Sequence, residues 1–333
     1  MSTLGIVIPC YRQERWLPRT LDALRTLPSG FRPSGALVYA GGGAPAQPLV
    51  PGPPGWRVVT PPAERRDAAP LTPGAARMAG LAACEGEWVL FADADVEVDA
   101  LWLARALARI ESGADARLAG LWGRIEEWFV DANGRESAGV PDLYRVGEAE
   151  HEVDYLATLA LYRRAALLEA GGYDSRLSSE EDFELGLRLR ARGFRLLSLA
   201  GRAARHWSAP RPSFSELSRR WSTGLCFGQG QVLRIYLGRP GFGRLIARQS
   251  LYLATLALWL AGAAALAVSA ARRSPAPLLS WLALGGAALA AMAVRKRSVR
   301  LAAHSALTWT MNGLGLLVGW FRVDPRTGRE AAC

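Results

Sequence analysis

Two aspartates separated by one alanine follow an apolar run in the segment GEWVLFADADVEV, residues 86–98. The run Trp88–Ala92 has the composition of a buried strand, and Asp93 and Asp95 come directly after it. Within a strand the two side chains would share one face, because side chains alternate with a period of two. In a turn just past the strand they can share Mg²⁺ or Mn²⁺, which prefer oxygen ligands and would also hold nucleotide phosphates. An ordinary solvated turn is the alternative interpretation.

A second acidic group lies in SSEEDFELGLRLRARGF, residues 178–194. Serines precede the acids, and basic residues and Gly193 follow them, which is the order expected for a capped helix. The positive end of the helix dipole is then expected to keep Asp182 ionised. Taken alone, the segment is a plain acidic helix start.

The elements that must position these acids alternate between strands and helices. Strands are expected at 4–11, 35–44, 56–60 and 88–92, and helices after residue 11, at 73–84 and at 100–112. Such alternation predicts a doubly wound parallel sheet, whose ligands bind at the carboxyl ends of the strands. A strand region at 118–129 follows, and then a strand and a helix that stops at Gly171 and Gly172.

Four segments stand in one order along the chain: VIPCY (7–11), GAARMAG (74–80), the DAD pair (93–95) and GGYD…EDFELGLRLRARG (171–193). Together they resemble the family 2 inverting glycosyltransferases, nucleotide-sugar enzymes with a GT-A-type fold. The resemblance covers about residues 4–235. It implies an α/β fold: a GT-A-type nucleotide-sugar-binding domain with a mostly parallel central sheet.

The resemblance also implies roles for the acids. Asp93 and Asp95 match the metal motif of the family, with Asp95 favoured as the direct ligand of Mg²⁺ or Mn²⁺. Asp182 matches the general base that deprotonates the acceptor hydroxyl, and Glu181 is its supporting partner. An inverting transfer needs one base opposite the departing diphosphate and a metal that neutralises the leaving group.

Other residues correspond to nucleotide-binding positions of the family. Pro9 and Tyr11 end the opening strand, and Arg77 matches the arginine of the following helix motif. Arg220 lies in the basic segment FSELSRRWSTGLCF, which would face the diphosphate, the acceptor or the membrane surface. His206 stands where some relatives place a histidine that approaches the metal, and a structural role is the alternative.

One departure from the family concerns the second strand. It usually ends in Asp-Asp-Gly-Ser, whose acid contacts the base or ribose, whereas this chain has Tyr39 and Ala40 in VYAGGGA. The three glycines do not form the G-x-G-x-x-G pattern of dinucleotide binding. Met78 also replaces the usual asparagine. The donor sugar and the nucleotide therefore remain unassigned.

The C-terminal part changes character at residue 251. The runs 251–271 and 276–294 carry no charge, and the first would be about 31 Å long as a helix, enough to cross a bilayer. A third apolar run, 301–321, is diluted by His304 and Asn312 and is expected to cross the membrane or lie flat at its surface.

Charge is segregated along the chain. Residues 1–200 carry 22 Arg and 27 acidic side chains, a net charge of −5, whereas residues 201–333 carry 18 basic and 3 acidic side chains, a net charge of +15. Basic residues beside apolar runs favour an anionic membrane as partner over a nucleic acid. Arginines before the first run and the basic loop 295–300 place both ends of a helical hairpin in the cytoplasm, although Arg272 and Arg273 count against this orientation.

The sequence thus predicts four parts: a catalytic domain (1–235), a basic interfacial linker (236–250), two to three membrane helices (251–321) and a tail (322–333). The expected protein is a metal-dependent inverting glycosyltransferase. It would move a sugar from a nucleotide-sugar to a lipid-linked or cell-envelope acceptor, with its catalytic domain on the cytoplasmic face of the membrane. No secretory signal pattern is evident. A non-catalytic membrane scaffold on a degenerate transferase domain is the alternative.

Overall fold

The structure, a computed structural model, describes residues 3–25, 34–40, 54–60, 71–113, 115–210 and 213–323. The described residues form two compact units, one ending at Pro210 and one that runs from Ser213 to Val323. The predicted glycine loop after Ala40 and nearly all of the predicted tail lie outside the described residues.

The first unit contains the strands predicted from apolar runs. In the order β3 (Arg57–Val59), β2 (Ser34–Tyr39), β1 (Leu4–Cys10) and β4 (Trp88–Ala92), neighbouring strands pair in parallel. All five residues of β4 are buried, as expected of a strand covered on both faces. The carboxyl ends of β1 and β4 therefore lie together at one edge of the sheet.

The second half of the sheet is mixed rather than parallel. β9 (Leu159–Arg163) runs antiparallel between β4 and β6 (Leu118–Val130). β10 (Arg195–Ser208) pairs in parallel with β6, and the edge strand β5 (Val96–Val98) pairs antiparallel with β10. The sequence patterns did not predict β5 or β10. Neither strand is a continuous apolar run in the sequence. β5 has three residues with a glutamate in the middle, and β10 contains arginines.

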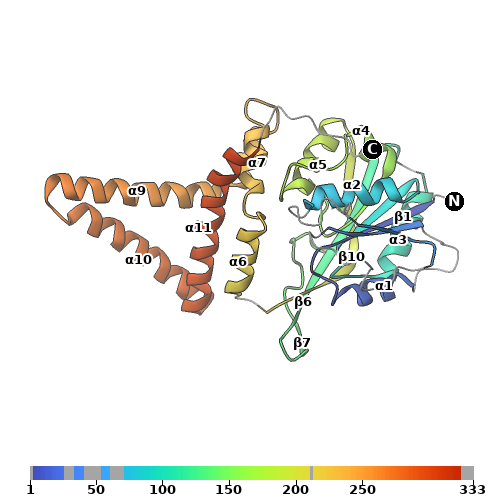
Figure 1. The fold of residues 1–333 in the computed structure, drawn as a ribbon, viewed down its shortest axis with the longest axis horizontal. Helices are drawn as coiled ribbons and strands as arrows, with labels where there is room; N and C mark the ends of the chain where they lie inside the picture. Colours follow the sequence, from blue (N-terminus) through green and yellow to red (C-terminus); the bar gives the residue numbers. More distant parts are fainter. Residues whose placement is uncertain are drawn as a thin grey trace. The chain divides into compact units, whose positions relative to one another are not determined.

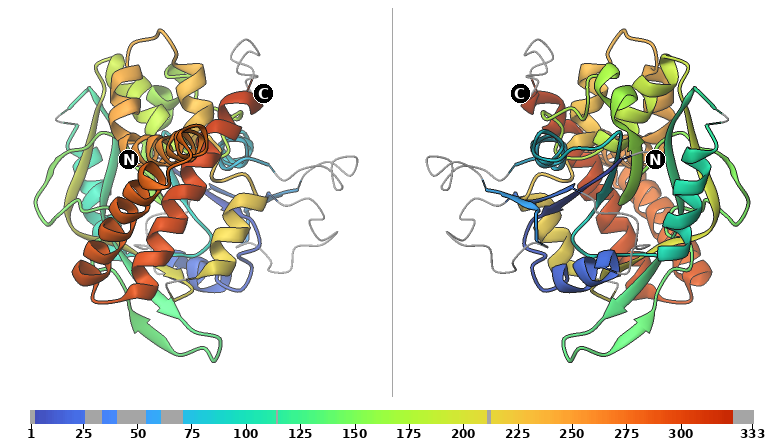
Figure 2. Two further views of the ribbon diagram at one scale, coloured as in Figure 1. Left: turned by 90° about the vertical axis from the view of Figure 1, so that its left-hand side faces the viewer. Right: turned by 90° about the vertical axis from the view of Figure 1, so that its right-hand side faces the viewer.

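Two short strands complete the sheet among the described residues. β7 (Glu136–Ala138) pairs with the end of β6, and β8 (His151–Glu152) pairs with the start of β10. The β6–β7 hairpin extends beyond the rest of the sheet (Figure 2).

Helices cover both faces of the sheet (Figure 1). α1 (Leu17–Arg25) and α3 (Ala100–Glu111) pack on one face, and their apolar side chains share a buried cluster with Ile6, Ile8 and Leu90. The other face is covered by α2 (Pro73–Ala83), α4 (Arg164–Glu169) and α5 (Glu181–Ala191). The sheet is thus the middle layer of an α/β/α arrangement.

The start of α5 differs from the predicted serine cap. The N-cap residue is Glu180, which has a φ of +67° and makes no side-chain hydrogen bond to the helix. A non-glycine residue in the left-handed region is uncommon and marks a backbone held by its surroundings. Here it fixes where the helix begins, and so where Glu181 and Asp182 leave the chain.

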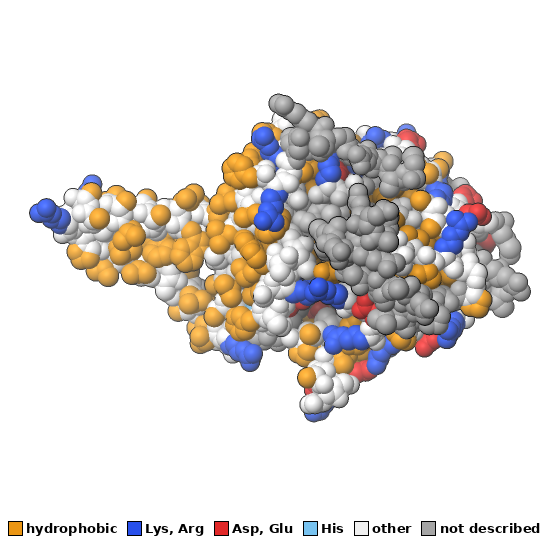
Figure 3. Space-filling model, viewed as in Figure 1, with side chains coloured by type: hydrophobic (Ala, Val, Ile, Leu, Met, Phe, Trp, Pro, Cys, Tyr) orange, Lys and Arg blue, Asp and Glu red, His pale blue; other side chains and the backbone are white. Residues whose placement is uncertain are grey.

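The second unit is helical: α6 (Phe214–Ser222), α7 (Gly228–Ile235), α8 (Phe242–Arg248), α9 (Ser250–Arg272), α10 (Ala276–Lys296) and α11 (Val299–Arg322). Helices α9 and α10 are long and apolar enough to cross a membrane, with mean hydropathies of 2.0 and 1.8. Their apolar windows are 6 % and 0 % buried. Figure 3 shows hydrophobic side chains along both helices on the face drawn. This exposure is the opposite of what a soluble core helix shows.

The third apolar run forms α11, which packs against α7 and α9. A Cβ atom at Gly319 would lie 1.9 Å from the carbonyl oxygen of Phe227, so the helix backbones approach each other closely. The buried Asn312 accepts a hydrogen bond from Gln229 at 3.2 Å. Asn312, one of the polar residues that interrupt the apolar run, thus serves helix packing within this unit.

Candidate active site

The two aspartates lie in a turn between β4 and β5, at the carboxyl end of β4. Three hydrogen bonds from other parts of the fold and one within the turn fix its position. Thr158 accepts from the Asp93 N–H at 3.0 Å, and the Trp207 N–H donates to the Asp95 carbonyl at 2.9 Å. Thr20 donates to the Ala94 carbonyl at 2.9 Å, and the Val96 N–H donates to that of Asp93 at 3.1 Å. The turn is therefore built into the fold and is not a loose solvated turn.

The two carboxylates face different partners. Asp93 Oδ1 lies 3.0 Å from Arg77 Nη2, whereas Asp95 Oδ2 accepts from Gln13 Nε2 and lies 3.5 Å from His206 Nε2. The sequence pattern singled out Asp93, Asp95 and His206 but missed Gln13. The loop between β1 and α1 carries Gln13, and nothing in its local sequence marks it.

His206 is partly buried, with 20 % of its side chain exposed, and it lies close to two acids. Burial alone would lower its pKa, but the hydrogen bond and the charge of Asp95, together with the charge of Asp93, raise it. Its Nδ1 atom is buried without a hydrogen-bond partner among the described residues. The strand β10, which the sequence patterns missed, is what brings His206 to the acidic turn.

The residues around Asp95 fit a divalent cation. Asp95 Oδ1 is buried and has no hydrogen-bond partner in the part of the chain that the structure describes. A carboxylate oxygen beside an imidazole nitrogen is a donor set that Mn²⁺ and related ions accept. The described residues contain no group of three or more His, Cys, Asp or Glu side chains placed to hold a metal. An ion here would take its remaining ligands from substrate and water.

The second acidic pair stands on the first turn of α5. Glu181 Oε1 lies 2.6 Å from Arg77 Nη1, and Asp182 Oδ1 lies 3.7 Å from the same nitrogen. Burial raises the pKa of Asp182 well above its usual range, and the charges of Glu181 and Asp93 add to this effect, while Arg77 opposes it. Burial therefore acts on the pKa of Asp182 in the direction opposite to the effect expected from the helix start.

Arg77, on α2, joins the two acidic groups. Its side chain is 6 % exposed, and its guanidinium also lies 5.2 Å from the ring centroid of Tyr173. Burial alone would lower the pKa of Arg77, but the charges of Asp182 and Asp93 raise it well above its usual value. The contact with a nucleotide expected for Arg77 stays a prediction. In the structure its nitrogens are directed at carboxylates.

The other predicted nucleotide contacts are placed as follows. Pro9 and Tyr11 lie at the carboxyl end of β1, and Tyr11 is partly buried against the cluster that contains Ala40. Arg220 lies on α6 in the second unit, beside the Cys226 thiol. The roles of all three residues stay predictions.

At the end of β2, Tyr39 and Ala40 do not supply the acid that the family has there. Tyr39 is 2 % exposed, and its ring packs in the core cluster with residues of α1. Ala40 is 3 % exposed and carries no polar group. Recognition of a base or ribose by an acid at these two positions is therefore excluded.

Comparison with known proteins gives a family match over part of the chain. Residues 65–171 match the sequence profile described as Glycosyl transferase family 2. The matched segment includes Arg77, Asp93 and Asp95 and ends before Asp182. No curated protein matches the chain in sequence.

Comparison with solved structures finds similar chains. The mannosyltransferase PcManGT from Pyrobaculum calidifontis, in complex with GDP-Man and Mn²⁺, is 20 % identical with a TM-score of 0.58, over 95 % of this chain and 87 % of that chain. S. aureus TarS 1–349 in complex with UDP-GlcNAc is 18 % identical with a TM-score of 0.45, over 67 % of this chain and 64 % of that chain. GalNAc-T7 with UDP, GalNAc and Mn²⁺ is 17 % identical with a TM-score of 0.47, over 68 % and 48 %.

The chain thus spans less than two thirds of TarS 1–349 and about half of GalNAc-T7, and the fold likeness rests on PcManGT. The matched profile, the α/β/α sheet and the acidic turn at the end of β4 agree with one another. Residues 65–171 thus match the family 2 glycosyltransferase profile, they lie in an α/β/α unit whose fold is like that of PcManGT, and two helices long and apolar enough to cross a membrane follow this unit.

Proposed function

We propose that this chain is a metal-dependent inverting glycosyltransferase. It transfers a sugar from a nucleotide-sugar to a lipid-linked or cell-envelope acceptor at the cytoplasmic face of a membrane. The observation that carries the proposal is the bridge through Arg77. One buried guanidinium contacts Asp93 of the turn that holds the metal motif and Glu181 of the helix that carries the proposed base. The two acidic groups belong to one site.

The proposed chemistry needs one base and one leaving group. Asp182 takes the proton of the acceptor hydroxyl while that oxygen attacks the anomeric carbon, and the bond from this carbon to the diphosphate breaks with its electron pair. A single carboxylate that acts on the acceptor side inverts the anomeric configuration. Glu181 is held by Arg77 at 2.6 Å and supports the position of Asp182.

Asp95 and His206 would hold the cation, with Asp93 beside them. Mg²⁺ or Mn²⁺, when bound there, supplies positive charge that stabilises the departing diphosphate. The PcManGT complex, which contains GDP-Man and Mn²⁺, supports this choice of ion and of donor class. The unpartnered Asp95 Oδ1 supports it from the geometry of this chain.

The membrane partner is proposed from α9 and α10. Exposed leucines lie along both helices, and Leu260 and Leu284 are 71 % and 64 % exposed near their centres. Basic residues flank the pair at Arg244, Arg248 and the loop 295–300. A hairpin with these ends in the cytoplasm follows the positive-inside rule and leaves the catalytic unit on the same side. Such a site would meet acceptors that are carried by lipids.

A second candidate is a membrane scaffold whose transferase domain no longer acts. The observation that favours it is the loss of acids at Tyr39 and Ala40. The retained acids around Arg77 count against it. Glu181 is buried, Asp182 and Asp93 are only 18 % and 27 % exposed, and a decayed site has no reason to keep three acids in such surroundings.

The test is the thermal shift of the purified full-length protein with a panel of nucleotide-sugars and Mn²⁺. Binding of one donor by the folded state raises the unfolding midpoint. The shift should vanish for Asp95→Ala and remain for Asp22→Asn, which changes an exposed acid paired with Arg25. If no donor shifts the wild-type protein, the scaffold is favoured.

A further inference from the structure

Thr158 has an unusual backbone at the edge of the site. It adopts a φ of +65°, and a β-branched residue in the left-handed region is a genuine outlier. Its carbonyl accepts the Asp93 N–H at 3.0 Å, so the same residue fixes the start of the acidic turn. Backbone strain of this kind persists at binding sites, where the surrounding structure enforces it.

The Thr158 hydroxyl pairs with a tyrosine. Its Oγ1 atom lies 2.5 Å from the hydroxyl oxygen of Tyr144, and both side chains remain partly exposed. In such a pair one hydroxyl donates to the other. One further O–H and several lone pairs then remain for a third group. The pair can therefore recognise a group that both donates and accepts.

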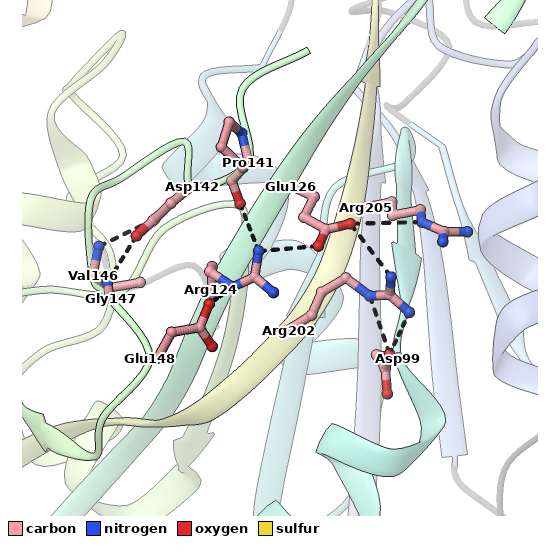
Figure 4. A network of polar contacts seen from close by, with 10 residues as sticks. All are labelled: Asp99, Arg124, Glu126, Pro141, Asp142, Val146, Gly147, Glu148, Arg202 and Arg205. Atoms are coloured by element: carbon pink, nitrogen blue, oxygen red, sulfur yellow. Dashed lines mark hydrogen bonds and ion pairs between the residues drawn. The ribbon is translucent and has the colours of Figure 1, made fainter. Parts of the chain in front are cut away.

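The segment 141–148, which carries Tyr144, is held in place by polar contacts (Figure 4). Asp142 accepts hydrogen bonds from the N–H groups of Val146 at 3.1 Å and Gly147 at 2.7 Å. Arg124 on β6 donates to the Pro141 carbonyl at 2.8 Å and pairs with Glu148 at 3.0 Å. These contacts close the segment on both sides of the tyrosine.

The ring of Tyr144 is also held by packing. It lies 5.1 Å from the ring centroid of Trp122, which is itself 1 % exposed. A hydroxyl supported by a pinned segment and a packed ring is already placed before a ligand arrives, which is what selective recognition requires.

The charges around Tyr144 indicate what it binds. Thr158 lies beside the acidic turn, because its carbonyl accepts the Asp93 N–H at 3.0 Å. Burial raises the pKa of Tyr144, the bond to Thr158 lowers it, and the charges of Asp182 and Asp93 raise it. A phosphate would be repelled there, whereas a neutral polyol would not. If the proposed function holds, the transferred sugar lies between Asp93 of the acidic turn and Asp182, the proposed base.

We propose that the Tyr144–Thr158 hydroxyl pair binds a hydroxyl group of the transferred sugar and so selects the donor by its sugar rather than by its nucleotide. This inference rests on the proposed function. It names two positioning residues that the sequence patterns did not single out.

The test separates sugar binding from nucleotide binding. Calorimetry on the full-length protein with Mn²⁺ would compare GDP-Man with GDP, and UDP-GlcNAc with UDP, or the panel donor that the wild type binds with its free nucleoside diphosphate. Tyr144→Phe should weaken binding of the nucleotide-sugar roughly tenfold, the effect of one lost hydrogen bond, and leave the nucleoside diphosphate unchanged. Tyr155→Phe is the matched control, since its ring packs on the same Trp122 at 5.8 Å.

Variants of Thr158 separate the hydroxyl from the backbone. Thr158→Ser should retain sugar binding, whereas Thr158→Gly should lose it as Tyr144→Phe does while unfolding at an equal or higher temperature, because glycine accepts a positive φ. Equal weakening of the nucleotide-sugar and the nucleoside diphosphate, or no effect of Tyr144→Phe on either, would overturn the inference. A wild-type protein that binds no nucleotide-sugar would instead overturn the proposed function.

Discussion

At the scale of single residues, Arg77 determines the electrostatics of the site. It is buried among Asp93, Glu181 and Asp182, and it opposes the rise that burial imposes on the pKa of Asp93 and Asp182. Without this cation one buried and two partly buried carboxylates would lie together with their charges uncompensated, which is costly away from water. Arg77 thus permits the proposed base and the proposed metal turn to lie close together.

Replacing Arg77 should affect both stability and the pH dependence of transfer. Arg77→Met is expected to lower the free energy of unfolding by about 3–5 kcal/mol, because it removes one partner of a buried ion pair. In the folded variant, the missing positive charge favours the protonated form of Asp182. The fall of activity with decreasing pH should therefore begin at a higher pH than in the wild type.

Heat unfolding and a pH–rate profile measure these two effects. Arg77→Lys should restore the charge but only part of the function, because one ammonium group cannot make the separate contacts of a guanidinium. An Arg77→Met protein with unchanged stability and an unchanged acidic limb would contradict this account.

At the scale of elements, α3 begins at a carboxylate that also anchors β10. The Asp99 side chain accepts from the N–H groups of Leu101 and Trp102 and from Arg202 (Figure 4). Burial alone would raise the pKa of Asp99, but the bond from Arg202 and the backbone N–H groups lower it. One residue therefore caps a helix and ties it to the strand that carries His206.

Asp99→Ala should destabilise the protein by about 1 kcal/mol at neutral pH, the usual cost of a lost N-cap. Because the folded-state pKa of Asp99 lies below the unfolded one, its contribution is present above the unfolded pKa and is lost as the pH falls through the folded pKa. The difference in unfolding midpoint from the wild type should thus shrink in acid.

The control for Asp99→Ala is Asp22→Ala, which alters an exposed carboxylate on α1 and should change stability by less than about 0.5 kcal/mol. An Asp99→Ala defect that persists unchanged at low pH would show that the ionised cap is not its cause.

The elements also show where sequence patterns succeed. β1 and β4 are contiguous apolar runs, so their identity and their carboxyl ends could be predicted. β10 could not, since Gly201 and the arginines at 202 and 205 interrupt its apolar residues. Its pairing with β6, far away in the sequence, creates the strand and places His206 beside Asp95.

The candidate site was predictable to a similar extent. Its acids come from local motifs, whereas the contacts of Arg77 join α2 to the turn after β4 and to the start of α5, about a hundred residues away. A buried arginine requires negatively charged partners, but the sequence does not say which acids they are. Thr158 and Tyr144 have no local signal, because a positive φ and a tertiary hydroxyl pair leave none.

At the scale of the whole molecule, the chain combines a soluble-type α/β/α unit with a helical unit that exposes apolar side chains. Helices α9 and α10 carry exposed leucines along their length, whereas the central strands β1, β2 and β4 of the first unit are almost wholly buried. This contrast is what a peripheral catalytic unit with a membrane hairpin requires.

Charges introduced into the hairpin should weaken membrane insertion. The double variant Leu260→Arg/Leu284→Arg places a cation near the centre of each helix, at a cost of roughly 3 kcal/mol per residue on insertion scales. The fraction of protein that resists extraction from membranes by carbonate should fall. Leu101→Arg, at a leucine that is 76 % exposed on α3, should have no such effect. Equal extraction of both variants would argue against the hairpin.

The central claim is that Asp182 acts as the base on a donor held by the metal turn. Its most direct test measures donor binding and sugar transfer for Asp182→Asn with the nucleotide-sugar that stabilises the wild type. An amide keeps the shape of the side chain but cannot take a proton. We predict unchanged donor affinity in the presence of Mn²⁺ and a transfer rate that falls by a factor of roughly 10² to 10⁴. Transfer at the wild-type rate would contradict the account.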